Sequence, residues 1–285
     1  PMYTAEVHRQ LLGAGMVLLE NLDLSQAREG VPYLLMAAPL LKTNVTVEVT
    51  GTVESRPYID LTVTALAAFG ISVSWFDDYT LKIAGNQAYR AGEIDVEGDY
   101  SGASYLAALD ALGGDVTVEG LRPDSLQGDR YIVEHLRKMG ADIRFTDEGI
   151  TAMPSTLHGT ELDCVDTPDL VPVLSIAAAT AQGTTTFTNV GRLRFKECDR
   201  LAAMKELLAL YGISSQIGED TFTVFGGEPV ATGIVDSYGD HRIAMTAAIM
   251  STVAQGTTRI GGASCVAKSY PSFFDDFASL GGTVE

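Results

Sequence analysis

The stretch 193–207 reads LRFKECDRLAAMKEL, and its periodicity predicts a helix. Four charged residues fall in the predicted first turn: Lys196, Glu197, Asp199 and Arg200. Because residues three apart share a helix face, Glu197 and Arg200 are expected to point the same way. A helix N-terminus favours anions, so two cations there predict an oxyanion or phosphate site whose carboxylate can carry a proton. A solvated, charged first turn is the competing interpretation.

Charged residues occupy comparable places elsewhere, at the starts of other expected helices or in the loops before them. The stretch YGDHR contains His241 and Arg242, AKSYP contains Lys268, and DTPDL contains Asp169. Arg200, Arg242 and Lys268 are each expected beside a helix N-terminus, which favours their convergence on one anion. Asp169 is either a helix cap or a general base on a substrate hydroxyl. His241 is either a base or a hydrogen-bonded structural histidine.

The overall charge of the chain limits what such a site could bind. The 285 residues carry a formal net charge of −18 at pH 7, which argues against nucleic acid or an anionic membrane as a partner. Against that background, clustered cations indicate a small anionic substrate. The sequence contains neither the GxxxxGKS/T phosphate loop nor the GxGxxG dinucleotide fingerprint.

Composition limits the class of protein further. Apolar residues make up 46% of the chain, enough for one large domain or two ordinary ones. No apolar run is long enough to span a bilayer, and the first residues lack the order of a signal peptide. Three scattered cysteines, Cys164, Cys198 and Cys265, indicate neither a disulfide framework nor a metal site. We therefore expect a reducing, cytoplasmic location.

A long repeat runs through the chain from residue 31 onward, and it predicts the fold class. Each unit begins with a helix that is apolar on nearly every side and therefore expected to be buried. A short strand follows and ends on a small residue. The four helices are predicted at 33–41, 101–112, 168–181 and 240–253, and the strands end at Gly51, Gly120, Asn189 and Gly262.

The second part of each unit is a loop, an amphipathic helix and, in the first three units, a β-hairpin. These helices are predicted at 57–69, 128–139, 197–211 and 271–280, each stopping at a glycine: Gly70, Gly140, Gly212 and Gly281. The hairpins are predicted at 71–85, 141–153 and 213–227. Four α-β-α-β-β units, the last cut short, indicate a layered α/β (α+β) architecture around shared buried helices.

The units also suggest a division of the chain. Residues 1–32 fit no unit, residues 33–96 hold one unit and form part of a first domain, and residues 97–285 hold three units and form a second domain. The boundary is expected within 87–98, where helical periodicity is lost.

Several stretches together resemble the 5-enolpyruvylshikimate-3-phosphate synthase (EPSP synthase) family of enolpyruvyl transferases. They occur in the family's order over about residues 34–282: LLMAAPLL, ESRPYID, VEGDYSGASY, LQGD, LRKMGADI, PDLVPVLSIAAA, GTTTFTNVGRLRFKECDRL, YGDHRIAM and CVAKSYPSFF. The resemblance implies an inside-out α/β barrel. It also implies transfer of the enolpyruvyl group from phosphoenolpyruvate to the 5-hydroxyl of shikimate 3-phosphate, with release of phosphate and with no metal or organic cofactor.

The resemblance further implies roles for individual residues. Arg200, Arg242 and Lys268 would bind phosphoenolpyruvate. Asp169 and Lys196 would contact the shikimate hydroxyls, with Asp169 as the base, and Glu197 would carry the proton to the methylene carbon. Ser55 and Tyr58 would belong to the shikimate phosphate pocket. Fixed cations in a water-poor cleft would stabilise two polyanionic substrates.

The sequence departs from the family in its first part, where the family's N-terminal lysine motif and its first-half arginine have no counterpart. Ala27, Arg28 and Glu29 replace the Ser-Ser-Gln that precedes LLM. One hypothesis is an active EPSP synthase, alone or completed by another chain. The alternative is an incomplete EPSP synthase that acts as a binding module, and an exposed apolar surface would favour self-association. UDP-N-acetylglucosamine enolpyruvyl transferase is a more distant alternative, because it shares the fold with other motifs.

Overall fold

The computed structural model of the chain describes residues 30–49, 53, 55–147 and 149–285. The chain divides into two compact units, Pro1–Val96 and Glu97–Glu285. Residues 84–99 form no helix or strand. The predicted segment 1–32 lies almost entirely outside the described residues. None of the helices in the described ranges combines the length and the apolar composition that a bilayer crossing requires.

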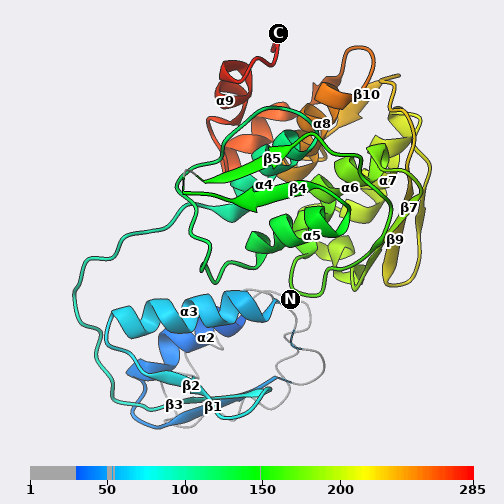
Figure 1. Cartoon of the computed structure of the whole chain (residues 1–285). Helices are drawn as coiled ribbons and strands as arrows, with labels where there is room; N and C mark the ends of the chain where they lie inside the picture. Colours follow the sequence, from blue (N-terminus) through cyan, green and yellow to red (C-terminus); the bar gives the residue numbers. More distant parts are fainter. Residues whose placement is uncertain (1–29, 50–52, 54, 148) are drawn as a thin grey trace. The chain divides into compact units, whose positions relative to one another are not determined.

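In the described part of the first unit, two α-helices and a short 3-10 turn pack on a three-stranded antiparallel sheet (Figure 1). Its helices are α2 (Gly30–Ala37), the 3-10 turn η1 (Ala38–Leu40) and α3 (Arg56–Ala68). The strands are β1 (Val45–Glu48), β2 (Val73–Trp75) and β3 (Thr80–Ile83), in the order β1-β3-β2. The hairpin β2–β3 confirms the prediction for 71–85. The hydrophobic core of the first unit includes Leu35, Leu66 and Leu81.

The prediction that the helix at 33–41 is buried on all sides is wrong. Tyr33 is 61% exposed, Met36 47% and Leu40 60%. Among the described elements of the first unit, α3 is the one α-helix that packs against α2. An apolar helix needs neighbours on several sides to be buried, and each equivalent helix in the second unit packs against at least three other α-helices.

The second unit is built around three mutually packed helices (Figure 1). These are α4 (Tyr100–Ala111), α6 (Val171–Thr180) and α8 (His241–Val253). Small residues such as Ala107, Ala178 and Ala247 are fully buried along them, which allows the helix backbones to approach closely. The prediction of shared buried helices is therefore confirmed for this unit.

Outer helices and small sheets cover this bundle, with β5 against α4, β9 against α6 and β10 against α8. The outer helices are α5 (Ile132–Lys138), α7 (Arg200–Leu210) and α9 (Phe273–Ser279). The strands are β4 (Asp142–Phe145), β5 (Ile150–Met153), β6 (Glu161–Asp163), β7 (Thr184–Thr188), β8 (Ser215–Ile217), β9 (Thr221–Phe225), β10 (Ile234–Asp236) and β11 (Arg259–Gly261). Short 3-10 turns connect them: η2 (Gly128–Tyr131), η3 (Pro168–Leu170), η4 (Gly191–Phe195) and η5 (Ala263–Lys268).

The sheets refine the predicted repeat. Strands β4–β5 and β8–β9 form the expected antiparallel hairpins, and β8-β9-β7-β6 is a four-stranded sheet. Strands β6 and β10 were not predicted, because three residues are too few to show a period. Each precedes a buried helix and pairs in parallel with the strand after it. The unit from β6 to β9 therefore has the order β-α-β-α-β-β, and the last unit begins in the same way with β10, α8, β11 and α9.

One predicted strand is wrong: residues 115–120 make only an isolated bridge between Val118 and Ile150. The predicted helix stops are confirmed, since Gly70, Gly140, Gly212 and Gly281 all have positive φ (79°, 96°, 73° and 100°).

Candidate functional site

Charged side chains from four separate segments of the second unit meet in one cluster. The segments are η3, the loop 196–199 with the start of α7, the start of α8, and the end of η5. They bring together six of the eight residues singled out in the sequence: Asp169, Lys196, Glu197, Arg200, Arg242 and Lys268. Residues separated by up to about a hundred positions thus become neighbours because the repeat places helix starts and preceding loops side by side.

Two local predictions about this cluster need correction. Lys196 and Glu197 do not lie in the first helical turn, because α7 begins at Arg200 and Asp199 is its N-cap, accepting from the Ala202 N–H at 3.1 Å. Lys196 is extended, with φ −87° and ψ −156°. Lys268 ends η5 and does not stand at the start of α9. Both lysines therefore reach the cluster from loops.

Arg200 is the centre of the cluster and is only 1% exposed. Its Nη1 donates to Asp169 Oδ1 at 2.9 Å, its Nη2 to Glu197 Oε2 at 2.6 Å, and its Nε to Asp240 Oδ2 at 2.6 Å. Burial lowers the pKa of Arg200, but Asp169 and Asp240 outweigh this and raise it. The guanidinium is thus fixed in position and charged.

Asp240 is a residue of this site that the sequence did not single out. It is completely buried, holds Arg200, and caps α8 by accepting from the Arg242 N–H at 2.9 Å. Its place at the end of the YGD turn was visible, because aspartate before a buried helix predicts a cap. What the sequence could not show is that the second oxygen faces Arg200.

Asp169 faces three cations and is 8% exposed. Oδ1 accepts from Lys196 Nζ and from Arg200, both at 2.9 Å, and Oδ2 lies 3.5 Å from Arg242 Nη2. Arg242 also donates from Nη1 to the Asp169 main-chain oxygen at 3.2 Å. The Asp169 carboxylate therefore lies among three cations, where it can also accept a hydrogen bond from a nearby hydroxyl.

Glu197 and Lys268 form the more open edge of the cluster. Lys268 Nζ lies 2.6 Å from Glu197 Oε1, and the Lys268 side chain is 56% exposed. Burial raises the pKa of Glu197, but the hydrogen bond from Lys268 and the charge of Arg200 dominate and lower it to about 2. Glu197 is therefore ionised across the neutral range.

Asp129 extends the cluster toward α4 and was also missed as a site residue. It is 1% exposed, accepts a hydrogen bond from the Ser101 hydroxyl, and lies 3.9 Å from Arg242 Nη2. His241, 6% exposed, lies beside Asp240, and burial followed by the charge of Arg242 lowers its pKa. His241 is therefore neutral near pH 7.

The whole cluster contains as many cations as carboxylates: Lys196, Arg200, Arg242 and Lys268 against Asp129, Asp169, Glu197 and Asp240. Its formal charge is thus balanced, unlike the simple cationic site that the sequence suggested. Within the described residues no group of three or more His, Cys, Asp or Glu could hold a metal ion. The arrangement can bind an anion and move protons, with acids and cations in alternation.

Ser55 and Tyr58 belong to the first unit and are described within it alone. Ser55 precedes α3 in a left-handed conformation with φ 52°, is 4% exposed, and accepts from the Tyr58 N–H at 3.0 Å. A left-handed non-glycine residue is uncommon and often marks a functional turn.

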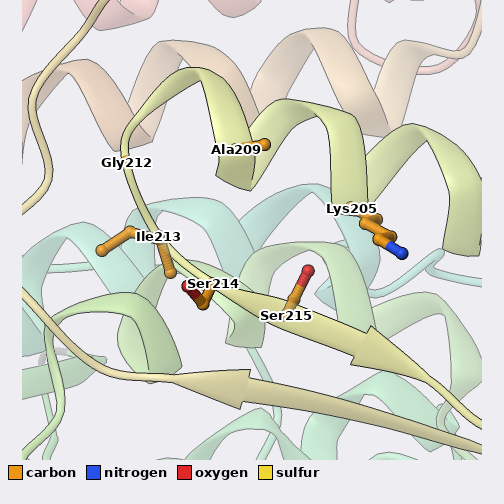
Figure 2. Close-up of a pocket in the computed structure, with 6 residues that line it drawn as sticks. All are labelled: Lys205, Ala209, Gly212, Ile213, Ser214 and Ser215. Atoms are coloured by element: carbon orange, nitrogen blue, oxygen red, sulfur yellow. The ribbon is translucent and has the colours of Figure 1, made fainter.

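A shallow hollow of about 330 Å³ lies elsewhere in the second unit, between the end of α7 and strand β8 (Figure 2). Its lining includes none of the clustered residues and consists of Lys205, Ala209, Gly212, Ile213, Ser214 and Ser215. The candidate site is therefore defined by its converging charges, and this hollow is separate from it.

Sequence comparison finds the family described as EPSP synthase (3-phosphoshikimate 1-carboxyvinyltransferase), which matches residues 20–277. The chain is 41% identical over 255 residues to the 3-phosphoshikimate 1-carboxyvinyltransferase of Clostridium kluyveri, covering 90% of this chain and 60% of that protein. It is 43% identical over 236 residues to the enzyme of the same name from Methanopyrus kandleri, covering 82% and 54%. The chain thus spans little more than half the length of these curated relatives.

Solved structures give the same picture of the fold. The EPSP synthase of Acinetobacter baumannii superposes with a TM-score of 0.73 at 27% identity, covering 88% of this chain and 60% of that one. The enolpyruvyl transferase NikO of Streptomyces tendae has a TM-score of 0.69 at 18% identity, covering 90% and 59%, and supports the fold alone. The mixed α/β fold of enolpyruvyl transferases expected from the sequence is confirmed.

Proposed function

Because this chain belongs to the EPSP synthase family, we propose that its charged cluster serves the transfer of an enolpyruvyl group from phosphoenolpyruvate to the 5-hydroxyl of shikimate 3-phosphate. The observation that carries the proposal is the meeting of Arg200, Arg242 and Lys268 with Asp169 and Glu197 in one site. Both proposed substrates are polyanions, and the addition step gives a proton to carbon while one leaves oxygen.

The proposed roles follow the geometry. Arg242 and Lys268, with Arg200 behind them, bind the phosphate and carboxylate of phosphoenolpyruvate. Asp169 takes the proton from the attacking hydroxyl, and Lys196, 2.9 Å from it, keeps that carboxylate oriented. Glu197 carries the proton for the methylene carbon. Asp240 is a positioning residue, because it acts through Arg200.

Ser55 and Tyr58 remain proposed members of the pocket for the shikimate phosphate. Ser55 is held in its left-handed conformation directly before α3. The two substrates, a cytoplasmic location and any partner chain stay predictions.

The second candidate is a binding module that holds one face of the site without turnover. The chain covers 54–60% of the relatives' length, so turnover by this chain alone is a separate proposal from substrate binding. The more distant alternative, a transferase acting on UDP-N-acetylglucosamine, has no support in the names of these relatives.

The deciding experiment measures phosphate release from the purified chain with shikimate 3-phosphate and phosphoenolpyruvate, beside calorimetric binding of each substrate alone. Turnover supports the enzyme, whereas binding without turnover supports the binding module. Failure to bind either substrate contradicts both candidates.

The best variant for this experiment is Lys268→Ala, because that side chain is exposed and pairs only at the open edge of the cluster. Arg200→Ala is less suitable, since it would leave three buried or half-buried carboxylates without their common cation. Lys205→Ala is the matched control, because Lys205 is an exposed lysine on α7 outside the cluster. Phosphoenolpyruvate affinity should fall at least tenfold in the first variant and stay unchanged in the control.

A further inference from the structure

Glu197 pairs with two cations of the site: Lys268 at its open edge and Arg200 at its buried centre. Its Oε1 accepts from Lys268 Nζ and its Oε2 from Arg200 Nη2, each at 2.6 Å. These are two of the three cations to which the proposed function assigns phosphoenolpyruvate. An incoming anion therefore meets cations that already hold a carboxylate.

Among the carboxylates around Arg200, Glu197 is the one that an incoming anion can displace at the least cost. Its side chain is 27% exposed, against 11% for Asp169 and none for Asp240. Asp240 is also tied to the α8 backbone and Asp169 to Lys196. Displacing either of those would disrupt the buried network, whereas Glu197 sits on a loop at the edge beside the exposed Lys268.

We propose that a dianion entering this site replaces Glu197 at Lys268 and Arg200, and that the released Glu197 carboxylate takes up one proton from solvent. The inference rests on the proposed function, because it uses the same cations. The balance is simple: the anion forms the two ion pairs that Glu197 loses, and the carboxylate becomes a carboxylic acid.

The surroundings of Glu197 favour protonation once the exchange has occurred. The groups that face it are Lys268 from η5, Arg200 from α7 and His241 from α8, with Asp169 of η3 and Asp240 reached through Arg200. Burial already raises the pKa of Glu197, and it is outweighed by Lys268 and Arg200 together with a backbone hydrogen bond. With both cations neutralised and a dianion nearby, burial and like-charge repulsion both raise its pKa.

This exchange explains how Glu197 could act as an acid at all. Paired as it is, with a pKa of about 2, it carries no proton near neutral pH. Binding of the anion would load it with the proton that the reaction needs, at the moment when the substrate is present. The balanced charge of the cluster also favours proton uptake on anion binding, since a bound dianion without an added proton would leave the site net negative.

The test is isothermal titration of the chain with sulfate at about pH 6, in two buffers of different ionisation enthalpy. Sulfate is a suitable probe because it does not itself titrate there. The difference in heat between the buffers gives the number of protons taken up. We expect a clear uptake of at most one proton, and a sulfate affinity that falls by up to tenfold per pH unit as pH rises.

The matched variant is Glu197→Gln, which keeps the shape and removes the titrating group. It should bind sulfate at least as tightly as the unmodified chain, without proton uptake and with little pH dependence. His241→Gln is the control for the other group that could titrate, and it should keep the uptake. A protonated-carboxyl band in the infrared difference spectrum, present in the unmodified chain and absent in Glu197→Gln, gives an independent readout.

The outcomes separate the two proposals. Sulfate binding without proton uptake overturns this inference and leaves the proposed anion site standing. Uptake that survives in Glu197→Gln, or disappears in His241→Gln, assigns the proton elsewhere and also overturns it. No binding of sulfate or phosphoenolpyruvate by a folded chain removes the proposed function together with the inference.

Discussion

Arg200 and Asp240 form a buried ion pair, with Arg200 Nε 2.6 Å from Asp240 Oδ2 and side-chain exposures of 2% and 0%. The same carboxylate caps α8 at the Arg242 N–H. One buried acid therefore fixes the guanidinium of one arginine and the helix that carries another. A buried pair is costly to desolvate, so its value lies in geometry, and removing one partner leaves an uncompensated charge.

Asp240→Asn should destabilise the chain by about 3 kcal/mol, because asparagine can still cap α8 but leaves Arg200 with one carboxylate fewer. Urea unfolding would show a lower midpoint with an unchanged slope. Asp275→Asn is the control, since Asp275 is an exposed acid on α9 and its loss should change stability by under about 0.5 kcal/mol. Equal effects of the two substitutions would contradict the role of Asp240.

Substitution of either of two glycines by alanine should destabilise the chain, for a different physical reason at each position. Gly212 has φ 73° and open space where a Cβ would stand, so Gly212→Ala should cost about 1–2 kcal/mol through backbone strain alone. A Cβ on Gly226 would lie 1.8 Å from the Ala181 main-chain oxygen, so Gly226→Ala should cost about 3 kcal/mol or more. Thermal unfolding should show a smaller fall in Tm for Gly212→Ala than for Gly226→Ala.

Asparagine separates the two mechanisms, because it tolerates the left-handed conformation better than alanine does. Gly212→Asn should be milder than Gly212→Ala. At Gly226 asparagine should be no milder than alanine, since the clash is with backbone. The same order at both positions would argue against this account.

His135 should make stability depend on pH. Burial, assisted by the charge of Lys138, lowers the pKa of His135 from 6.5 to about 4. The unfolded chain therefore binds the proton first, so the stabilisation is complete above pH 6.5 and is lost as pH falls toward 4. The full shift corresponds to about 3 kcal/mol.

His135→Gln should flatten the pH dependence of the free energy of unfolding in that window, measured by urea unfolding at several pH values. His158→Gln, at an exposed histidine, should keep the slope of the unmodified chain. An unchanged slope in His135→Gln would rule out His135 as its source.

Salt should stabilise the chain, because a net charge of −18 repels itself across a compact surface. Raising ionic strength from about 0.01 M to 1 M shortens the Debye length from about 30 Å to 3 Å. We expect a gain of roughly 1 kcal/mol, seen as a rise in Tm of about 2–4 °C. Sodium chloride and potassium chloride should act alike, whereas a falling Tm would mean that attractive surface pairs dominate.

The sequence by itself determined the elements that depend on local chemistry. The buried helices of the second unit follow from their apolar composition, the hairpins from alternation, and the helix ends from glycines such as Gly140 and Gly212, whose φ is positive. The family followed from motifs in the right order. The proposed site residues were picked from the same motifs, and Asp169, Glu197 and Lys268 do meet in one cluster.

Only the tertiary structure decided how those charges pair. The position of Asp240 before a buried helix indicates a helix cap. Nothing along the chain shows that its other oxygen accepts a hydrogen bond from Arg200, forty residues away. The exposure of Tyr33 and Met36 likewise depends on how many helices pack beside α2. Hydrophobic periods and caps act over a few residues and can be read locally, whereas ion pairing and burial depend on which distant segments the packed helices bring together.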